Sequence, residues 1–295
     1  MHISGLVSVI IPVRDGALTI DRCLEAIARQ TYRPLELVVI DDGSNDPSAA
    51  WVRAFRKRHP ELSVHVVEQS PLGTAAAINV GLTRVRGEFV AFAHQADEWH
   101  AEKLAWQVAQ LQGHSAAEAS IAAVAEQIGT ARTQQSPPRG WPMRPVALSS
   151  LLMRRSALAP LNPALATVSG FTLAARCGLS GSALRLGREV AVCHRKRAAL
   201  WSADEMARVW QDLRDEGRLG DRRLAATTSR VYAERGWQCL LAAAPDAARE
   251  DFRRAARLAW RPEAWIGLAC VGFDRALIAT GWLRQGAQPA FVSER

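Results

Sequence analysis

The chain has 295 residues, of which 48% are hydrophobic and 22% charged, and its formal net charge is +8. This balance excludes disordered and fibrous classes and favours a soluble globular protein. The five cysteines contain no CxxC pair, which argues against a disulfide framework or a thiolate zinc site. The first residues lack the pattern of a secretory signal, and no charge-free window reaches the roughly 20 apolar residues of a membrane span, so we expect a cytoplasmic protein.

The positive charge is concentrated in the middle of the chain. Residues 1–131 carry 11 basic and 15 acidic side chains, whereas residues 132–235 carry 18 basic and 8 acidic ones. Only three of the cations are lysines, so most of the charge is guanidinium, which suits phosphate groups or acidic surfaces. Arginine-rich solvent faces of helices explain the same counts. No nucleic-acid-binding motif is present, and we expect no nucleic-acid partner.

Short β-branched runs alternate with helical patterns in residues 1–111, which predicts a parallel sheet built from βαβ units. The expected strands are Val7–Pro12, Leu35–Ile40, Val64–Glu68 and Glu88–Ala93. The expected helices are Ile20–Gln30, Ser48–Arg58, Gly73–Arg84 and Glu102–Leu111.

The rest of the chain changes character twice. Residues 129–145 are rich in Gln, Ser, Pro and Gly without an apolar period, which predicts a flexible loop. A mixed segment follows, and residues 204–295 read as a helical region. The helices expected there are Asp204–Glu216, Asp221–Arg235, Asp246–Ala259 and Ala264–Leu283. The third of them resembles half of a tetratricopeptide unit, but one copy does not make a repeat array.

Several motifs follow one another in a characteristic order. They are Pro12-Val13-Arg14-Asp15-Gly16, the segment Glu36–Asp46, the segment Gly87–Phe92 and the segment Asp97–Leu104. Over residues 1–110 this order resembles the family 2 glycosyltransferases. The resemblance implies a GT-A fold, which is an α/β fold with a Rossmann-like, mostly parallel sheet and helices on both faces. It also implies a nucleotide-diphosphate sugar donor and a Mn or Mg ion held by an Asp-x-Asp motif.

The resemblance divides the chain into three parts. Residues 1–128 would be the nucleotide-binding half of a GT-A domain, residues 129–203 an acceptor-side segment with the flexible loop at 129–145, and residues 204–295 a C-terminal helical appendage. The donor would be a uridine or other pyrimidine diphosphate by resemblance alone, and the residues do not specify the sugar.

Asp42 follows the second expected strand. A carboxylate at the C-terminal end of a parallel strand sits where α/β folds bind ligands, and it accepts hydrogen bonds from a base or a ribose. By resemblance, Asp42 contacts the base, Pro12 lines the nucleoside pocket and Gly73 lies in the loop around it. Alternatively, residues 42–46 are only a turn whose side chains satisfy backbone N–H groups. The surrounding motifs favour the nucleotide-binding interpretation.

The family's metal motif aligns with residues 93–99. His94 and Ala96 stand where the family has aspartates. Since Mg²⁺ and Mn²⁺ prefer carboxylate oxygens, Asp97 alone would make a weak site. His94 with Asp97 would suit a softer metal, although a lone histidine is more often a structural hydrogen-bonding group. We therefore assign His94 and Asp97 to the diphosphate or metal region and expect no metal site.

The catalytic base also has no counterpart. An inverting transferase needs a carboxylate to take the acceptor proton. The family places it in a Glu-Asp pair that aligns with Ser169-Gly170, and residues 127–188 contain no Asp, Glu or His at all. Glu189 would serve only in a rebuilt site, and Cys177 is a remote candidate nucleophile. We assign no catalytic residue.

These losses predict a glycosyltransferase-like pseudoenzyme or regulator that binds a nucleotide sugar without ordinary metal-dependent transfer. One alternative is a metal-independent transferase whose arginines neutralise the departing diphosphate, the candidates being Arg154, Arg155, Arg195 and Arg197. Another is an interaction scaffold whose C-terminal helices contact a protein partner or the inner face of a membrane. The aromatic residues that suggest such a surface are Trp260, Trp265, Phe273 and Trp282. The interpretation that we favour from the sequence is instead that these aromatic side chains pack the helical appendage onto the core.

Overall fold

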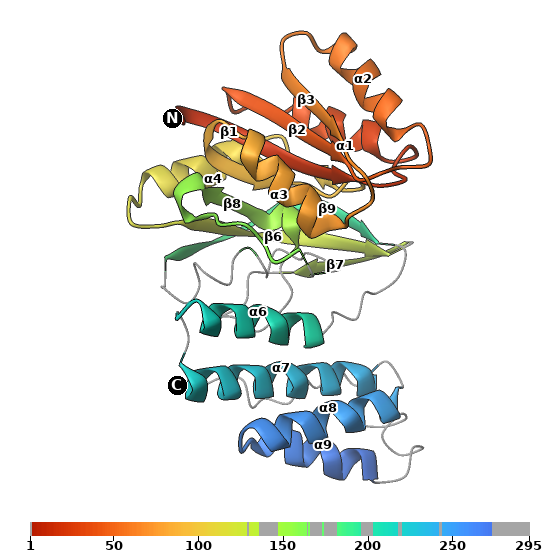
Figure 1. Ribbon diagram of the computed structural model, residues 1–295, viewed down its shortest axis with the longest axis vertical. Helices are drawn as coiled ribbons and strands as arrows, with labels where there is room; N and C mark the ends of the chain where they lie inside the picture. The colour runs from red at the N-terminus through yellow and green to blue at the C-terminus, as the bar shows by residue number, and fades with distance from the viewer. Residues whose placement is uncertain are drawn as a thin grey trace. The chain divides into compact units, whose positions relative to one another are not determined.

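The computed structural model describes residues 2–128, 130–135, 147–163, 165, 173, 182–195, 203–217, 220–241 and 244–272. The chain divides into two compact units, Met1–Ala198 and Ala199–Arg295. Figure 1 shows the helices and strands of both units.

Four parallel strands form the N-terminal part of the first unit. They are β1 (Ile3–Val13), β2 (Leu35–Asp41), β3 (Ser63–Glu68) and β4 (Gly87–Phe92), and they lie side by side in the order β3-β2-β1-β4 (Figure 1). β2 is buried along its whole length, as expected for a β-branched run covered on both faces. All four strands were predicted from the sequence.

Helices cover both faces of these strands. On one face, α1 (Ile20–Ala28), α2 (Ser48–Arg58) and α4 (Lys103–Gln112) share a core with the inward side chains of β1 and β2. On the other face lies α3 (Thr74–Arg84), whose Gly81 packs so closely that a Cβ there would stand 2.7 Å from the Ile10 side chain. The expected α/β architecture with helices on both faces is confirmed.

The sheet continues from β4 through strands of mixed direction. These are β8 (Leu151–Arg154), β6 (Ala119–Ile128), β9 (Ala183–Arg195) and the short β5 (Glu98–Trp99), in that order. β8 is antiparallel to both β4 and β6, and β9 is parallel to β6. Short 3₁₀ helices flank β8 at Leu148–Ser150 and Arg155–Ala157.

The prediction of a loop at 129–145 is wrong for residues 131–135. They form β7 (Ala131–Gln135), which pairs antiparallel with β6 from Ile128↔Ala131 to Val124↔Gln135. The sequence of β7 is mostly polar and lacks the apolar alternation that signals a strand. Backbone pairing with β6 defines the strand instead, and a sequence pattern does not reveal that pairing. Residues 136–146 lie outside the described part of the chain.

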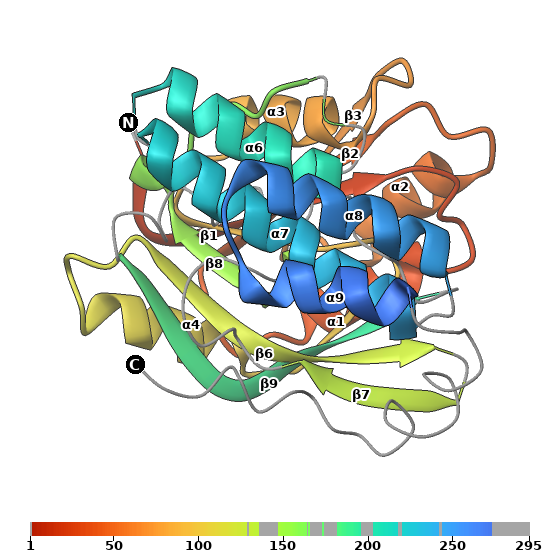
Figure 2. The ribbon, with the colours of Figure 1, turned by 90° about the horizontal axis from the view of Figure 1, so that it is seen from below.

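The second unit contains α6 (Ala203–Asp215), α7 (Asp221–Leu241), α8 (Pro245–Leu258) and α9 (Pro262–Gly272). α8 and α9 lie side by side (Figure 2). The sequence predicted that α7 ends at Arg235, before Gly236. Instead α7 continues through Gly236, because the missing side chain leaves room for the Phe252 ring, which a Cβ would meet at 2.7 Å. Among the described residues, no helix combines the length and apolar character needed to cross a membrane.

A buried carboxylate connects the first strands of the sheet. Glu36 of β2 has a side chain that is 1% exposed. It accepts hydrogen bonds from Ser8 Oγ (2.6 Å), from the Arg86 backbone N–H (2.7 Å) and from Arg86 Nε (2.9 Å) and Nη2 (2.8 Å). Burial acts to raise the pKa of Glu36, but the hydrogen bonds from Ser8 and Arg86 outweigh it and hold the pKa below its usual value.

Replacing Arg86 should therefore destabilise the fold in a pH-dependent way. Arg86→Gln deprives a buried carboxylate of its charged partner, and we expect the free energy of unfolding at neutral pH to fall by about 1–3 kcal/mol. The wild-type contribution is complete above the unfolded pKa of about 4.3 and disappears as the pH falls through the lower folded pKa. Urea unfolding should thus show a smaller difference at about pH 3. The control Arg84→Gln, an exposed neighbour, should change stability by less than about 0.5 kcal/mol. An equal deficit at both pH values would contradict this account.

Candidate functional site

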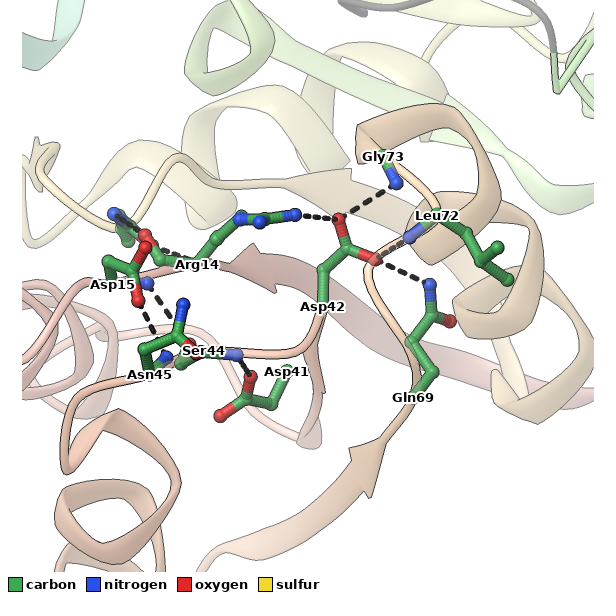
Figure 3. Close-up of polar contacts among 10 residues, drawn as sticks. Arg14, Asp15, Asp41, Asp42, Ser44, Asn45, Gln69, Leu72 and Gly73 are labelled. Atoms are coloured by element: carbon green, nitrogen blue, oxygen red, sulfur yellow. Dashed lines mark hydrogen bonds and ion pairs between the residues drawn. The ribbon is translucent and has the colours of Figure 1, made fainter.

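The loops that follow β1, β2, β3 and β4 meet at the carboxyl edge of the parallel strands, as expected for such a sheet. Hydrogen bonds join the first two loops: the Asp15 backbone N–H donates to Ser44 Oγ (3.0 Å), and the Asn45 backbone N–H donates to Asp15 Oδ1 (2.7 Å; Figure 3). Asp15 has a φ of 47°, a left-handed conformation that is strained for a residue with a side chain. The loops are thus fixed to each other before any ligand arrives.

Asp42 joins the loop after β2 to the loop after β3. Its Oδ1 accepts hydrogen bonds from Gln69 Nε2 (2.8 Å) and the Leu72 backbone N–H (2.9 Å), and its Oδ2 accepts one from the Gly73 backbone N–H (2.9 Å; Figure 3). Its side chain is only 6% exposed. The carboxylate therefore holds residues 69–73 in place, and Arg14, half-exposed, reaches within 4.0 Å of it.

Gly73 ends that loop and precedes α3. Its φ of 93° lies in the region that side-chain-bearing residues avoid, and a Cβ at this position would meet nothing within 4 Å. The backbone conformation, rather than close packing, accounts for glycine here. The N-terminus of α3, whose first backbone N–H groups have no partner within the helix, opens at the same edge as Asp42.

Pro12 lies where β1 and β4 separate. Pairing between these strands ends at Ile10↔Phe92, so the missing N–H of Pro12 costs no bond to β4. Beyond this point the Gln95 side chain replaces the strand pairing. Its Oε1 accepts a hydrogen bond from the Arg14 backbone N–H (2.8 Å), and its Nε2 donates to the Arg14 carbonyl (2.9 Å). The glycine at position 16 leaves room for the Gln95 side chain, because a Cβ there would lie only 2.6 Å from Gln95 Oε1.

The turn after β4 contains His94 and Asp97, which face different surroundings. The His94 side chain is 41% exposed, whereas that of Asp97 is fully buried. Asp97 Oδ2 accepts hydrogen bonds from Ser149 Oγ (2.7 Å) and Cys193 Sγ (3.5 Å). Asp97 Oδ1 has no hydrogen-bond partner among the described residues, and His94 Nδ1 lies 3.9 Å from it. The carboxylate is thus directed toward the 3₁₀ helix and β9.

Cys23 of α1 contacts the same turn. Its thiol donates to the His94 carbonyl oxygen (3.4 Å), and burial, together with the nearby Asp97 charge, raises the pKa of the thiol. Cys23 is therefore a neutral packing residue and not a reactive thiolate.

These residues do not fit the family's divalent metal. Ala96 has no ligand atom, and Asp97 is engaged with Ser149. Within the described part of the chain, no three His, Cys, Asp or Glu side chains converge as a metal site would require. We derive no step that depends on a metal.

Beneath the turn lies a buried lysine that the sequence reasoning missed. Lys103 of α4 is fully buried, and its Nζ donates to Gln107 Oε1 (2.5 Å) and the Leu151 carbonyl (3.3 Å). Nζ also lies 4.4 Å from the centroid of the Trp99 ring. Burial lowers the pKa of Lys103 to about 7. Gln95, Ser149 and Cys193 were also missed, and of these only Gln95 lies inside a motif that the sequence reasoning used.

Of the remaining candidates, the structure describes Arg154, Arg155 and Glu189. Arg154 donates to the Ala117 and Leu111 carbonyls and pairs with Glu88 at the start of β4, so the suggestion that it neutralises a diphosphate is wrong. Glu189 of β9 pairs with Arg132 of β7. Arg155 lies in the second 3₁₀ helix. Outside the described residues lie Ser169, Gly170, Cys177, Arg197, Phe273, Trp282 and the side chain of Arg195.

Curated relatives match the N-terminal part of the chain. The glycosyltransferase GlyA of Streptococcus pneumoniae is 33% identical over 99 residues, which are 34% of this chain and 14% of that protein. The Escherichia coli enzyme UDP-Glc:alpha-D-GlcNAc-diphosphoundecaprenol beta-1,3-glucosyltransferase WfgD is 33% identical over 106 residues, 36% of this chain and 41% of that protein. The chain thus spans less than half the length of either relative.

Solved structures share the fold over most of the chain. Staphylococcus aureus TarS (residues 1–349) superposes with a TM-score of 0.61 and 18% identity, covering 95% of this chain and 92% of that one. The mannosyltransferase PcManGT of Pyrobaculum calidifontis, in complex with GDP-Man and Mn²⁺, superposes with a TM-score of 0.62 and 22% identity, covering 95% and 82%. At these identities the likeness shows a shared GT-A fold. The family description "Glycosyl transferase family 2" matches residues 8–159, which is more than half of the sequence, and the chain therefore belongs to glycosyl transferase family 2.

Proposed function

We propose that the protein binds a nucleoside-diphosphate sugar at the carboxyl edge of β1–β4 but lacks the metal-dependent transfer usual for its family, acting as a pseudoenzyme or regulator. One observation supports the proposed lack of metal-dependent transfer. Asp97 is the last carboxylate in the 94–97 turn, and it is buried against Ser149. Structural neighbours support the proposed binding of a nucleotide sugar, since TarS is solved with UDP and with UDP-GlcNAc, and PcManGT with GDP-Man.

In this proposal Asp42 shapes the nucleoside pocket by holding the backbone of residues 72 and 73, while Pro12 lines the pocket beside the gap between β1 and β4. Arg14 supplies the nearest half-exposed positive charge, 4.0 Å from Asp42, and is suited to a phosphate group. His94, also partly exposed, lies at the same edge on the other side of Gln95.

Removal of Asp42 should weaken nucleotide binding. Asp42→Ala leaves the N–H groups of Leu72 and Gly73 without their acceptor, and we expect calorimetry to show UDP binding weaker by about tenfold or more. Glu68→Gln is the matched control, because it removes an exposed carboxylate one residue before the segment 69–73 that Asp42 holds, and it should bind UDP like the wild type. If Asp42→Ala bound every nucleoside diphosphate unchanged, the pocket would have to lie elsewhere.

The wild type should show no Mn²⁺-dependent donor hydrolysis or transfer, and Mn²⁺ should not tighten its nucleotide binding. The missing metal removes a Lewis-acid contribution of several kcal/mol, and the missing base removes a further ~10²–10⁴-fold in rate. His94→Asp combined with Ala96→Asp should introduce Mn²⁺-dependent tightening of UDP binding, whereas His94→Asn with Ala96→Asn should not.

Addition of Ser169→Glu and Gly170→Asp to the aspartate pair tests the missing base. Turnover by the unmodified protein with Mn²⁺ would refute the proposal. Turnover that persists equally with a chelator would support the alternative of a metal-independent transferase.

A second proposal concerns the C-terminal unit, where apolar side chains are exposed within nine residues of one another. Leu258, Trp260, Trp265 and Ile266 are 40%, 78%, 52% and 51% exposed, and Arg253 and Arg257 lie exposed on the adjoining α8. Tryptophan with arginine suits the headgroup layer of an anionic membrane. WfgD is named for an acceptor carried on diphosphoundecaprenol, which supports a membrane-surface acceptor here. The protein would then be cytoplasmic and peripheral to the inner face of the membrane.

Flotation with vesicles should test this surface. The wild type should float with vesicles that contain phosphatidylglycerol and not with pure phosphatidylcholine, and Trp260→Ser with Trp265→Ser should abolish flotation because the apolar anchor is gone. Trp51→Ser is the control, since Trp51 is an exposed tryptophan of the other unit. Failure of the wild type to float would reject the membrane contact. The membrane contact would also be rejected if light scattering showed a dimer for the wild type and a monomer for the double variant.

A further inference from the structure

A pocket of about 340 Å³ opens at β3, the strand at the end of the sheet order. Its lining consists of Arg56, His65, Val66, Val67, Arg84 and Arg86. Four of these side chains are basic and none is acidic. Because β3 pairs only with β2 among the described strands, its outer edge also presents backbone groups that have no partner strand.

The two outer arginines reach this edge from opposite faces of the sheet. Arg56 extends from α2, which covers one face, and Arg84 ends α3, which covers the other. Val66 and Val67 are the apolar residues of the lining, and as neighbours in a strand they point to opposite faces of the sheet. Their apolar surface lowers the local dielectric constant and so strengthens the electrostatic attraction of a bound anion.

Only part of the positive charge in the pocket is compensated. Arg86 is neutralised by Glu36, and His65 Nε2 lies 3.1 Å from Ser63 Oγ and 4.0 Å from Glu36 Oε2. Glu68, the acidic residue of β3, pairs with Arg53. Among the described residues, neither Arg56 nor Arg84 has an ion-pair partner. Two exposed guanidinium groups therefore face one small pocket with no counter-charge.

We propose that this pocket binds a phosphate group of an anionic ligand. The planar guanidinium fork matches phosphate oxygens, and two forks on opposite sides of the pocket would hold such a group from both directions. The pocket is separate from the carboxyl edge. Arg84 ends α3 and the nucleotide edge lies at its first residue, Thr74, so about 15 Å of helix lies between them. The inference therefore does not depend on the proposed nucleotide site.

Calorimetry with inorganic pyrophosphate tests the pocket. Arg56→Gln combined with Arg84→Gln should bind pyrophosphate about tenfold more weakly than the wild type, because two charge-assisted hydrogen-bond donors are lost. The matched control, Arg29→Gln with Lys57→Gln, removes the same charge from exposed positions outside the lining and should bind like the wild type. UDP binding should be unchanged in both variants, which separates this site from the nucleotide edge.

A second arm identifies the source of the phosphate group. The wild type and both variants are floated with phosphatidylcholine vesicles that contain or lack phosphatidic acid. If the wild type binds pyrophosphate and its flotation does not depend on Arg56 and Arg84, the ligand is a soluble phosphorylated molecule. Flotation on phosphatidic acid that only the Arg56 and Arg84 variant loses indicates a lipid headgroup. The proposal is overturned if that variant binds both probes as the wild type does, or if the wild type binds neither.

Discussion

The separation of β1 from β4 beyond Ile10 is the constraint on which the site depends. From Val7 to Ile10 the two strands share a parallel ladder, and after Ile10 their loops are joined by side chains. Gln95 makes this connection to Arg14 with two hydrogen bonds, and Pro12 is tolerated in the gap because it has no N–H to satisfy. The gap between β1 and β4 and the Gln95 contact that bridges it thus both follow from the end of strand pairing at Ile10.

This arrangement changes what the turn after β4 can do. In this chain the turn is held by an amide contact to a neighbouring loop, by the Cys23 thiol below and by Ser149 and Cys193 around Asp97. Each of these bonds is made within the protein, so the turn is ordered by its own hydrogen bonds, and Asp97 Oδ2 is committed to Ser149 and Cys193.

The sequence predicted those parts of the fold that local patterns define. Leu35–Ile40 is a fully buried β-branched run bounded by turn residues, and Ser48–Arg58 is an amphipathic helix, so neither depends on distant contacts. β7 and the continuation of α7 through Gly236 were mispredicted, because strand pairing with β6 and the Phe252 ring decide them. The site shows the same division. Asp42 was proposed from its place after a strand, and its role at a nucleotide site stays a prediction. The interior orientation of Asp97 was not predictable, because its partners Ser149 and Cys193 are 52 and 96 residues away.

Lys103 makes the stability of the core sensitive to mild alkalinity. In the folded protein its ammonium group loses its proton near pH 7, since burial lowers the pKa to about 7, whereas in the unfolded chain it stays protonated to a pKa of about 10.4. Between these values unfolding takes up a proton, so the folded state gains stability as the pH rises across this interval. The neutral amine also retains a lone pair that an ammonium lacks. A residue that looks like an ordinary surface cation in the sequence therefore forms, in the folded protein, a buried polar link between α4 and the start of β8.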